Sequence, residues 1–249
     1  MKILILGSTG LLGNTITRYF FENPKYQTKA IIRNSSKVVF FKKKYQKNFI
    51  IINNILDLPL MKKHVSSFMP ELIINCIGLT NKLSMQKLDY IKESILINAY
   101  LPNKLYEICS KFGIRLIQFS TDCVFSGKKG KYTEKDNPDP LDIYGKSKLL
   151  GEINFENSIT IRKSVIGHEL ASARGLLEWF LCQENSVNGF KNVLFSAHRA
   201  GALEQAFFDM GEIVLKDMSL ILKKKPPKFC KRAERKTVKL LASKPVAIN

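Results

Sequence analysis

The residues with the clearest chemical potential are two hydroxyls, a phenol and an amine between positions 120 and 148. Ser120 and Thr121 follow the apolar run IRLIQF, which reads as a strand. Tyr144 and Lys148 come after a loop rich in Gly, Lys, Asp and Pro, and they are four residues apart. Since residues i and i+4 share a face of a helix, the phenol and the amine can converge with a hydroxyl. Such a group can protonate a carbonyl oxygen while a hydride reaches the carbonyl carbon.

This interpretation depends on the neighbours of the phenol and on the segments upstream. A tyrosine with its ordinary pKa near ~10 needs roughly 4 kcal/mol of help to act as an acid near pH 7. A lysine ammonium beside Tyr144 has the sign that lowers the pKa of the phenol. The spacing of Tyr144 and Lys148 is common by chance, so the earlier motifs carry much of the argument.

Three glycines follow the first apolar run of the chain. KILILG at 2–7 predicts a strand, and Gly7, Gly10 and Gly13 then have the spacing G-x-x-G-x-x-G at the start of a helix over about 11–22. Glycine lets the backbone approach a pyrophosphate, and the helix offers free N–H groups and the positive end of its dipole. The sequence therefore predicts a dinucleotide site that includes Gly7, Thr9, Gly10, Leu11, Leu12 and Gly13.

The second predicted strand, KAIIRN at 29–34, indicates which dinucleotide is bound. It ends beside Arg33, at the position where an acidic residue suits NAD and an arginine suits the 2′-phosphate of NADP. We therefore expect NADP (NADPH) as the cofactor. The alternative interpretation is that Arg33 is an ordinary solvated arginine.

Later apolar runs predict the rest of a parallel sheet. Strands are expected at 49–56, 71–78, 114–119 and 158–167, with a last short strand at 192–196. Asp57, Asn75 and Gly78 then fall at the carboxyl edge of the sheet, where ligands of open parallel sheets lie. Because the strands alternate with helical patterns, we expect an α/β fold with a doubly wound parallel (Rossmann) sheet.

The predicted helices differ in how clear their patterns are. A short amphipathic helix is expected over the basic segment 35–48, a long one over 88–112, one from Tyr144 to about 156, and one over 175–183 with Trp179 in the core. Pro102 is expected to kink or divide the long helix. Asn98 lies within that helix as a polar exception, and simple exposure would account for it.

Composition argues against several classes of protein. The five cysteines and three histidines are scattered, so no disulfide framework and no metal site is expected. The net charge is +19, but only eight of the 40 basic residues are arginine, the better residue for planar phosphate or base contacts, so we expect no specific nucleic-acid partner. No apolar run reaches the ~18 residues of a membrane span and MKILILG has no signal-peptide layout, which predicts a cytoplasmic protein.

Together these motifs resemble a known family. GSTGLLG at 7–13, NCIG at 75–78, STDCVF at 120–125, YGKSK at 144–148 and IRKSVIG at 161–167 resemble the extended short-chain dehydrogenase/reductases. The acidic, proline-rich lead-in to Tyr144 and the GE at 151–152 are most similar to the dTDP-4-dehydrorhamnose reductase group. The resemblance implies NADPH-dependent reduction of a nucleotide-activated 4-keto-deoxysugar for surface polysaccharide synthesis.

The resemblance also implies roles for individual residues. Tyr144 would be the general acid, Lys148 would hold the nicotinamide ribose and assist it, and Thr121 would hydrogen-bond the substrate oxygen, with Ser120 as a substitute. The three glycines would seat the pyrophosphate and Arg33 the 2′-phosphate. Asp57 would lie near the adenine, and Asn75 and Gly78 would line the cofactor.

The segment after residue 196 departs from the family. Alanine occurs four times before residue 197 and seven times from there on. A shifted reading frame, a fusion or rapid divergence would each produce such a change. We expect an NADP-binding domain at 1–157, final strands and the start of a substrate-binding portion at 158–196, and an atypical basic segment at 197–249. Within it, 203–222 predicts a helix, and 223–236 (KKKPPKFCKRAERK) predicts an exposed, mobile stretch.

Two alternatives to the reductase stay open. One is a sugar-nucleotide epimerase or dehydratase on the same scaffold. The other is a non-catalytic NADP-binding protein, regulatory or vestigial, because the substrate-binding portion looks incomplete. The partners expected are a nucleotide-sugar substrate and, as an open alternative to a monomer, a second copy in a homodimer.

Overall fold

The computed structural model describes residues 1–80, 86–165, 167 and 170. The chain divides into two compact units, one of Met1–Val165 with Glu169–Ala171 and one of Ile166–His168 with Ser172–Asn249. Nearly all of the described residues belong to the first unit. The predictions for 175–183, 192–196, 203–222 and 223–236 lie outside the described residues.

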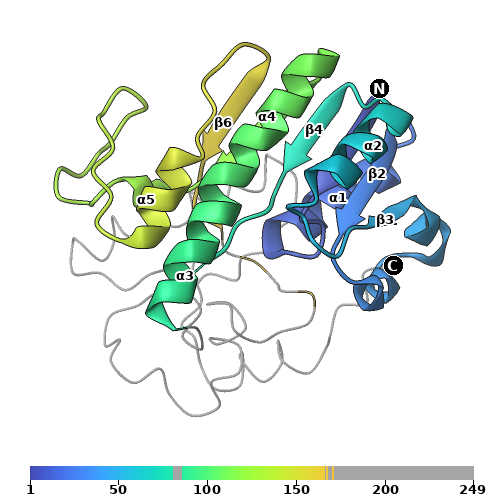
Figure 1. Cartoon of the computed structure of the whole chain (residues 1–249), viewed down its shortest axis with the longest axis horizontal. Helices are drawn as coiled ribbons and strands as arrows, with labels where there is room; N and C mark the ends of the chain where they lie inside the picture. The colour runs from blue at the N-terminus through green and yellow to red at the C-terminus, as the bar shows by residue number, and fades with distance from the viewer. Residues whose placement is uncertain (81–85, 166, 168–169, 171–249) are drawn as a thin grey trace, which may run out of the picture. The chain divides into compact units, whose positions relative to one another are not determined.

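Six parallel strands form one sheet in the order β3-β2-β1-β4-β5-β6 (Figure 1). They are β1 Lys2–Leu6, β2 Gln27–Ile32, β3 Phe49–Ile51, β4 Leu72–Asn75, β5 Arg115–Ser120 and β6 Ser158–Arg162. The chain order reverses between β1 and β4, where Leu6 pairs with Asn75. This is the doubly wound sheet that the sequence predicts, and its ligand-binding crevice is expected at the carboxyl ends of the strands near that reversal.

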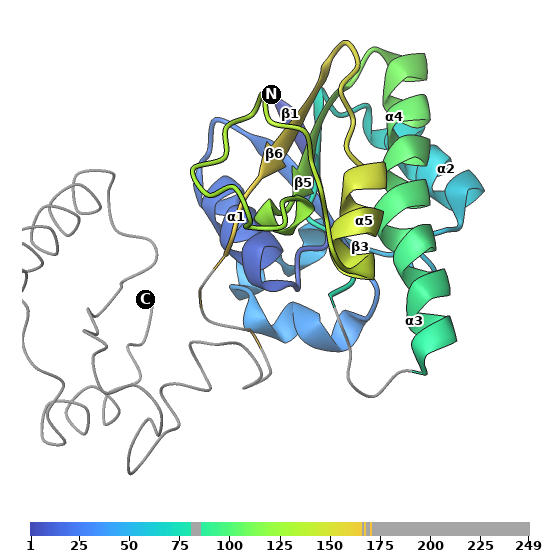
Figure 2. The same cartoon turned by 90° about the vertical axis from the view of Figure 1, so that its left-hand side faces the viewer.

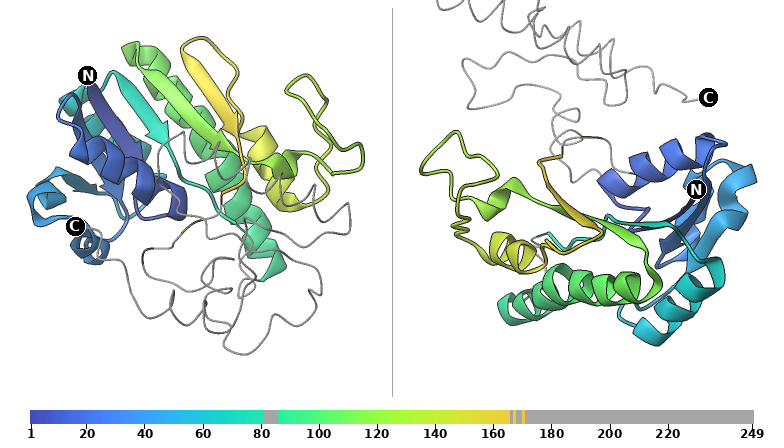
Figure 3. Two further views of the ribbon diagram at one scale, coloured as in Figure 1. Left: turned by 180° about the vertical axis from the view of Figure 1, so that it is seen from behind. Right: turned by 90° about the horizontal axis from the view of Figure 1, so that it is seen from above.

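Helices cover both faces of the sheet (Figures 2 and 3). α1 (Leu11–Glu22) lies on one face, and α2 (Leu58–Phe68), α4 (Leu101–Phe112) and α5 (Ile143–Leu150) lie on the other. α3 (Lys87–Ser94) precedes α4 along the chain. The view from above in Figure 3 shows the sheet between these two layers.

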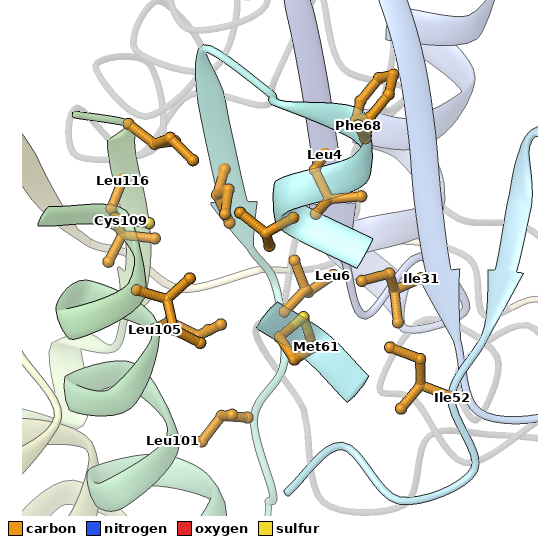
Figure 4. Packing of buried hydrophobic residues seen from close by; sticks show 14 of the residues in the cluster. Leu4, Leu6, Ile31, Ile52, Met61, Phe68, Leu101, Leu105, Cys109 and Leu116 are labelled. Carbon is orange, nitrogen blue, oxygen red and sulfur yellow. The ribbon is translucent and has the colours of Figure 1, made fainter. Parts of the chain in front are cut away.

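The side chains of β1 explain why two layers are needed. Successive residues of a strand point to opposite faces, so Ile3 and Ile5 face one layer and Leu4 and Leu6 the other. Ile3 and Ile5 pack with residues of α1, while Leu4 and Leu6 pack with Met61 and other residues of α2 and α4 (Figure 4). All four β1 side chains are fully buried, and each contributes about 1.5–3 kcal/mol by leaving water. The strand that leads into Gly7 is therefore held by packing on both of its faces.

Two helical predictions need correction. The segment 35–48 forms two 3₁₀ helices, η1 Ser35–Phe40 and η2 Lys43–Asn48, rather than one amphipathic helix. Only Phe41, between them, is buried, whereas Val39 is 70% exposed. The helix after Tyr144 ends at Leu150 and not near 156, because Gly151 caps it and the chain turns into β6.

The predicted helix over 88–112 is continuous but contains a wider turn. A π-helical segment, η3 Ile95–Tyr100, joins α3 to α4, and the N–H of Leu101 bonds to the carbonyl of Leu96. Pro102 has no N–H, so the carbonyl of Asn98 loses its α-helical donor there. The expected irregularity before Pro102 is thus a π-turn. Asn98, for which exposure was a sufficient explanation, is fully buried.

One further helix, α2, was not predicted from the sequence. α2 begins after Asp57, whose carboxylate accepts a hydrogen bond from the N–H of Leu60, and Pro59 stands in its first turn. An N-cap followed by proline is a helix-start signal that could have been recognised.

No helix in the described ranges is long and apolar enough to cross a membrane. The same ranges contain no group of three or more His, Cys, Asp or Glu side chains that could hold a metal ion.

Candidate active site

The residues singled out from the sequence come from different strands and lie along one edge of the sheet. Gly7 follows β1, Arg33 follows β2, and Asp57 lies beyond β3. Asn75 ends β4, and Ser120 ends β5 with Thr121 next to it. Because all six strands are parallel, these positions share the carboxyl edge, where ligands of such sheets lie.

Two of the three glycines are required by the chain itself. Gly7 has φ +80°, and a Cβ there would lie 2.9 Å from the backbone of Cys76. A Cβ on Gly13 would lie 2.1 Å from the carbonyl oxygen of Gly7. These contacts let α1 pack directly against the turn, so neither glycine is by itself a sign of a ligand.

Gly10 is different, and it provides the test of whether a dinucleotide fits. Its φ of −79° suits any residue, and a Cβ would meet only the Gly7 oxygen, at 3.5 Å. Gly10 is exposed and caps α1 without a side-chain hydrogen bond, and the first turn holds no acidic residue. Among the described residues no side chain caps this end of α1, so its N–H groups and the positive end of its dipole fit a pyrophosphate. Thr9, Leu11 and Leu12 are half-buried around this turn.

Arg33 and Asp57 take distinct positions at the edge. Arg33 is exposed immediately beyond β2. Asp57 is also exposed, but one oxygen of its carboxylate caps α2 through the N–H of Leu60 at 3.0 Å. Asp57 thus has a structural role that accounts for its presence whether or not it meets an adenine.

Asn75 and Gly78 shape the strand end beside the glycine turn. The amide of Asn75 is buried, donates to Gln118 at 2.7 Å and accepts from the N–H of Ile77 at 3.1 Å. Gly78 is exposed, and a Cβ built there would lie 3.4 Å from Nζ of Lys148. Gly78 therefore leaves open the approach to the lysine.

Asn98 is a site residue whose importance the sequence did not reveal. Its amide oxygen accepts from the N–H of Leu79 at 2.7 Å, and its amide nitrogen donates to the carbonyl of Leu79 at 2.9 Å and to Oγ of Ser147 at 3.1 Å. Asn98 thus ties the segment after Gly78 to the helix that carries Lys148. The only sequence signal was a polar residue in an apolar helical run four residues before Pro102.

The hydroxyl of Thr121 lies beside the start of α5. Thr121 is buried, donates to the carboxylate of Asp122 at 3.1 Å and accepts from the N–H of Cys123 at 3.2 Å. Gly145 lets α5 approach this turn, because a Cβ there would lie 2.3 Å from the carbonyl oxygen of Cys123. The neighbour of Gly145 in the sequence is Tyr144, so the phenol and the Thr121 hydroxyl come from two segments in direct contact.

The pKa of the Tyr144 phenol is raised, whereas the sequence predicted that it would be lowered. Burial raises the pKa of the Tyr144 phenol, and the side chain of Thr121 only partly opposes this rise. Sequence reasoning expected Lys148 to lower it. In the protein without ligands the phenol is therefore held in its protonated, proton-donating form at neutral pH.

The side chain of Lys148 is buried, and few neighbouring groups offset the cost of removing its charge from water. Burial lowers the pKa of its amine from 10.5 to about 8, although the carboxylate of Glu152 favours the charged form. The amine donates one hydrogen bond, to the carbonyl of Phe119 at 2.6 Å. An ammonium has three N–H donors, so two of them have no acceptor within the described part of the chain.

Ser120 is also brought to the site. Its hydroxyl is buried and has no hydrogen-bond partner among the described residues. The arrangement thus combines a protonated phenol, two hydroxyls and an amine along the sheet edge where α1 begins. These groups can donate protons and hydrogen bonds to an oxygen next to a bound dinucleotide.

Comparison with known proteins agrees with this geometry. Residues 1–167 match the family described as the RmlD substrate binding domain. The sequence resemblance was expected to extend to about residue 196, and the family match ends earlier.

Similar proteins include one curated relative and two solved structures. Methionine adenosyltransferase 2 subunit beta of Danio rerio is 30% identical over 151 residues, which are 61% of this chain and 42% of that protein. The structure of a hypothetical dTDP-4-dehydrorhamnose reductase from Sulfolobus tokodaii is 30% identical over 65% of this chain and 55% of that one, with a TM-score of 0.53. The dTDP-4-dehydrorhamnose reductase of Bacillus anthracis in complex with NADP is 25% identical over 65% and 52%, with a TM-score of 0.50.

The chain spans less than half the length of this curated relative and little more than half of the two solved chains. The family match nevertheless covers the whole described sheet, from β1 to β6. The chain belongs to the RmlD substrate binding domain family, a group of extended short-chain dehydrogenase/reductases similar to dTDP-4-dehydrorhamnose reductases.

Proposed function

We propose that this chain is an NADPH-dependent reductase of a nucleotide-activated 4-keto-deoxysugar. The observation that carries the proposal is the position of the Lys148 amine, close to Gly78 at the cofactor edge and on the same helix as Tyr144. This position links a dinucleotide site to a proton donor. The division into a cofactor-binding domain at 1–157, a substrate-binding start at 158–196 and an atypical segment at 197–249 is part of this proposal.

The cofactor is assigned to the open helix terminus and its neighbours. Gly7, Gly10 and Gly13 seat the pyrophosphate, Arg33 contacts the 2′-phosphate, and Gly78 lines the nicotinamide side. The relative from Bacillus anthracis was crystallised with NADP, which supports this choice. Thr9, Leu11, Leu12, Asp57 and Asn75 complete the proposed cofactor site.

In the proposed reaction the bound cofactor supplies a hydride to the keto carbon. Tyr144 donates its proton to the keto oxygen, and the raised pKa of the phenol keeps that proton in place before substrate arrives. Thr121 contacts the same oxygen. Lys148 holds the nicotinamide ribose and, as an ammonium, stabilises the phenolate that Tyr144 becomes.

The test is cofactor oxidation with a panel of 4-keto sugar nucleotides, comparing the wild-type protein with Tyr144→Phe. The substitution keeps the ring and deletes the donor, so turnover should fall about 10²-fold or more while NADPH binding persists. Tyr106→Phe is the matched control, because Tyr106 lies on α4, packs against Phe155 and is outside the proposed site, so turnover should be unchanged. Near-full turnover in Tyr144→Phe would show that another group is the acid.

A second candidate function is a non-catalytic, NADP-binding regulatory subunit. The name of the Danio rerio relative, a subunit beta of a methionine adenosyltransferase, favours it. This candidate predicts NADPH binding without turnover on any substrate of the panel. It also predicts that Tyr144→Phe leaves NADPH binding unchanged and alters at most the free energy of unfolding of the protein without ligand.

A further inference from the structure

A nearly buried ion pair lies just beyond the helix that carries Tyr144 and Lys148. The side chain of Glu152 is 5% exposed, and Arg162 binds it through two hydrogen bonds, Nε to Oε1 at 2.8 Å and Nη2 to Oε2 at 2.7 Å. Glu152 follows the last residue of α5 by two positions, and Arg162 ends β6. This fork-to-fork arrangement fixes the direction of both side chains, which a single contact would not do.

The same strand end contacts the loop after β5. The guanidinium of Arg162 lies over the ring of Phe125, 5.1 Å from its centroid. Two residues on, the hydroxyl of Ser164 donates to the carboxylate of Asp122. Since extended residues two apart point the same way, Arg162 and Ser164 face that loop together.

These contacts reach both halves of the candidate site. Asp122 also accepts the hydrogen bond of Thr121, so Ser164 acts on the group that orients the Thr121 hydroxyl. Arg162 acts on Glu152, which is four residues after Lys148. The end of β6 is thus the place where the two proton-handling segments are held against a common third element.

We propose that Arg162 and Ser164 are positioning residues that hold the Thr121 loop and the Tyr144–Lys148 helix in one arrangement, Arg162 through Glu152 and Phe125, and Ser164 through Asp122. The role in turnover rests on the proposed reductase function. The mechanical and electrostatic role does not, and it can be measured without substrate.

The electrostatic consequence has a definite sign. The groups that act on the charge of Lys148 are the carboxylate of Glu152 and the thiol of Cys76. Since Arg162 pairs with the Glu152 carboxylate at 2.7 Å, we expect its positive charge to weaken the effect of that carboxylate on Lys148. Removing the carboxylate in Glu152→Gln should therefore lower the pKa of Lys148, and removing the cation in Arg162→Gln should raise it.

The first measurement is an NMR titration of the Lys148 Nζ in the full chain without cofactor, with the signal assigned by its loss in Lys148→Met. Shifts of opposite sign, each about 0.5 pH units or more, are expected for Glu152→Gln and Arg162→Gln. Glu107→Gln, which removes the exposed Lys104–Glu107 pair, is the matched control and should leave the titration unchanged. Identical titration midpoints in the wild-type and Arg162→Gln proteins would overturn the proposal.

The second measurement separates positioning from plain stabilisation. In Arg162→Lys and Ser164→Ala, kcat should fall about tenfold or more while the Kd for NADPH stays within about twofold, and Arg162→Lys should retain more activity than Arg162→Gln. Unchanged kcat in both variants of an active enzyme would also overturn the proposal. If the wild-type protein has no turnover, the reductase function fails, and the titration of Arg162→Gln still decides the inference. Should Arg162→Gln not fold, Arg162→Lys takes its place with a smaller upward shift.

Discussion

Replacing the proposed ribose-binding lysine by methionine should stabilise the protein. Lys148 is buried, and its pKa is about 8 in the folded protein against 10.5 for an ordinary lysine. Keeping the amine charged inside the fold therefore costs about 3 kcal/mol at pH 7. Methionine has a similar length and no charge, but it forfeits the hydrogen bond to the carbonyl of Phe119, worth about 1–2 kcal/mol. Lys148→Met should thus raise the free energy of unfolding by about 1–2 kcal/mol at pH 7.

The pH dependence gives the sharper form of this prediction. Below pH 8 the amine is protonated in both the folded and the unfolded wild-type protein, so the cost is fully present. Between pH 8 and 10.5 the unfolded chain binds more protons than the folded one, and the stability of the wild type rises with pH. The advantage of Lys148→Met should therefore shrink across this window. Near pH 10.5 it should reverse to a deficit of about 1–2 kcal/mol, because only the lost hydrogen bond remains.

Urea unfolding followed by far-UV circular dichroism at pH 7 and pH 10 measures both points. Burial raises the pKa of the Cys76 and Cys109 thiols to about 12, which lowers the free energy of unfolding of both the wild type and Lys148→Met at high pH. The quantity to compare is therefore the difference in the free energy of unfolding between the two proteins. Lys146→Met, at an exposed position of the same helix, is the control and should stay within about 0.5 kcal/mol of the wild type. A Lys148→Met protein that is less stable at pH 7, or whose difference from the wild type is the same at both pH values, would refute the reasoning.

Four further substitutions separate the roles of individual residues. Arg33→Ala should remove most of a preference for NADPH over NADH, roughly 10- to 150-fold, in fluorescence titrations with the two cofactors, and equal affinities in the wild type would contradict the assignment. Asn98→Ala should lower the free energy of unfolding by about 2–5 kcal/mol, because it removes the side-chain partner of both the N–H and the carbonyl of Leu79. A loss under about 0.5 kcal/mol would show that these two hydrogen bonds are not important for stability. Gly10→Ala should weaken NADPH binding without altering the free energy of unfolding in urea, whereas Gly13→Ala should lower that free energy by about 1–3 kcal/mol or more. Equal effects of the two substitutions on the free energy of unfolding would argue against an open N-terminus of α1.

The sequence was most informative where a local pattern decides the structure. The apolar run before Gly7 predicts β1, the pattern after it predicts a helix over about 11–22, and α1 spans Leu11–Glu22 as expected. Parallel strands buried on both faces are nearly continuous apolar runs, so most of them are recognisable without knowledge of their neighbours. Once the strands are parallel, the placement of Thr121 and Asn75 at one edge follows from chain direction alone.

Features that depend on contacts between distant segments were not predictable. The burial of Asn98 depends on its hydrogen bonds to Leu79 and Ser147, which are 19 and 49 residues away. The pKa of Tyr144 is raised because its side chain is buried, and burial by segments distant in the chain cannot be predicted from residue spacing. The pair of Glu152 and Arg162 likewise requires the turn between α5 and β6, which the sequence analysis replaced by an overlong helix.

Some buried polar groups near the carboxyl edge of the sheet have no hydrogen-bond partner among the described residues, which supports a functional role for this edge. Among the described residues, four buried hydroxyls have no hydrogen-bond partner, and they belong to Thr17, Tyr90, Ser94 and Ser120. Ser120 precedes Thr121 at the end of β5, and Tyr90 is near enough to Tyr144 to affect the pKa of its phenol. Together with the desolvated Lys148, these are costs of about 1–3 kcal/mol each that a fold selected only for stability would remove. Ser120 ends β5 and the Lys148 amine bonds to the carbonyl of Phe119 on the same strand, so part of this cost falls at the strand end where the keto oxygen and ribose are proposed to bind.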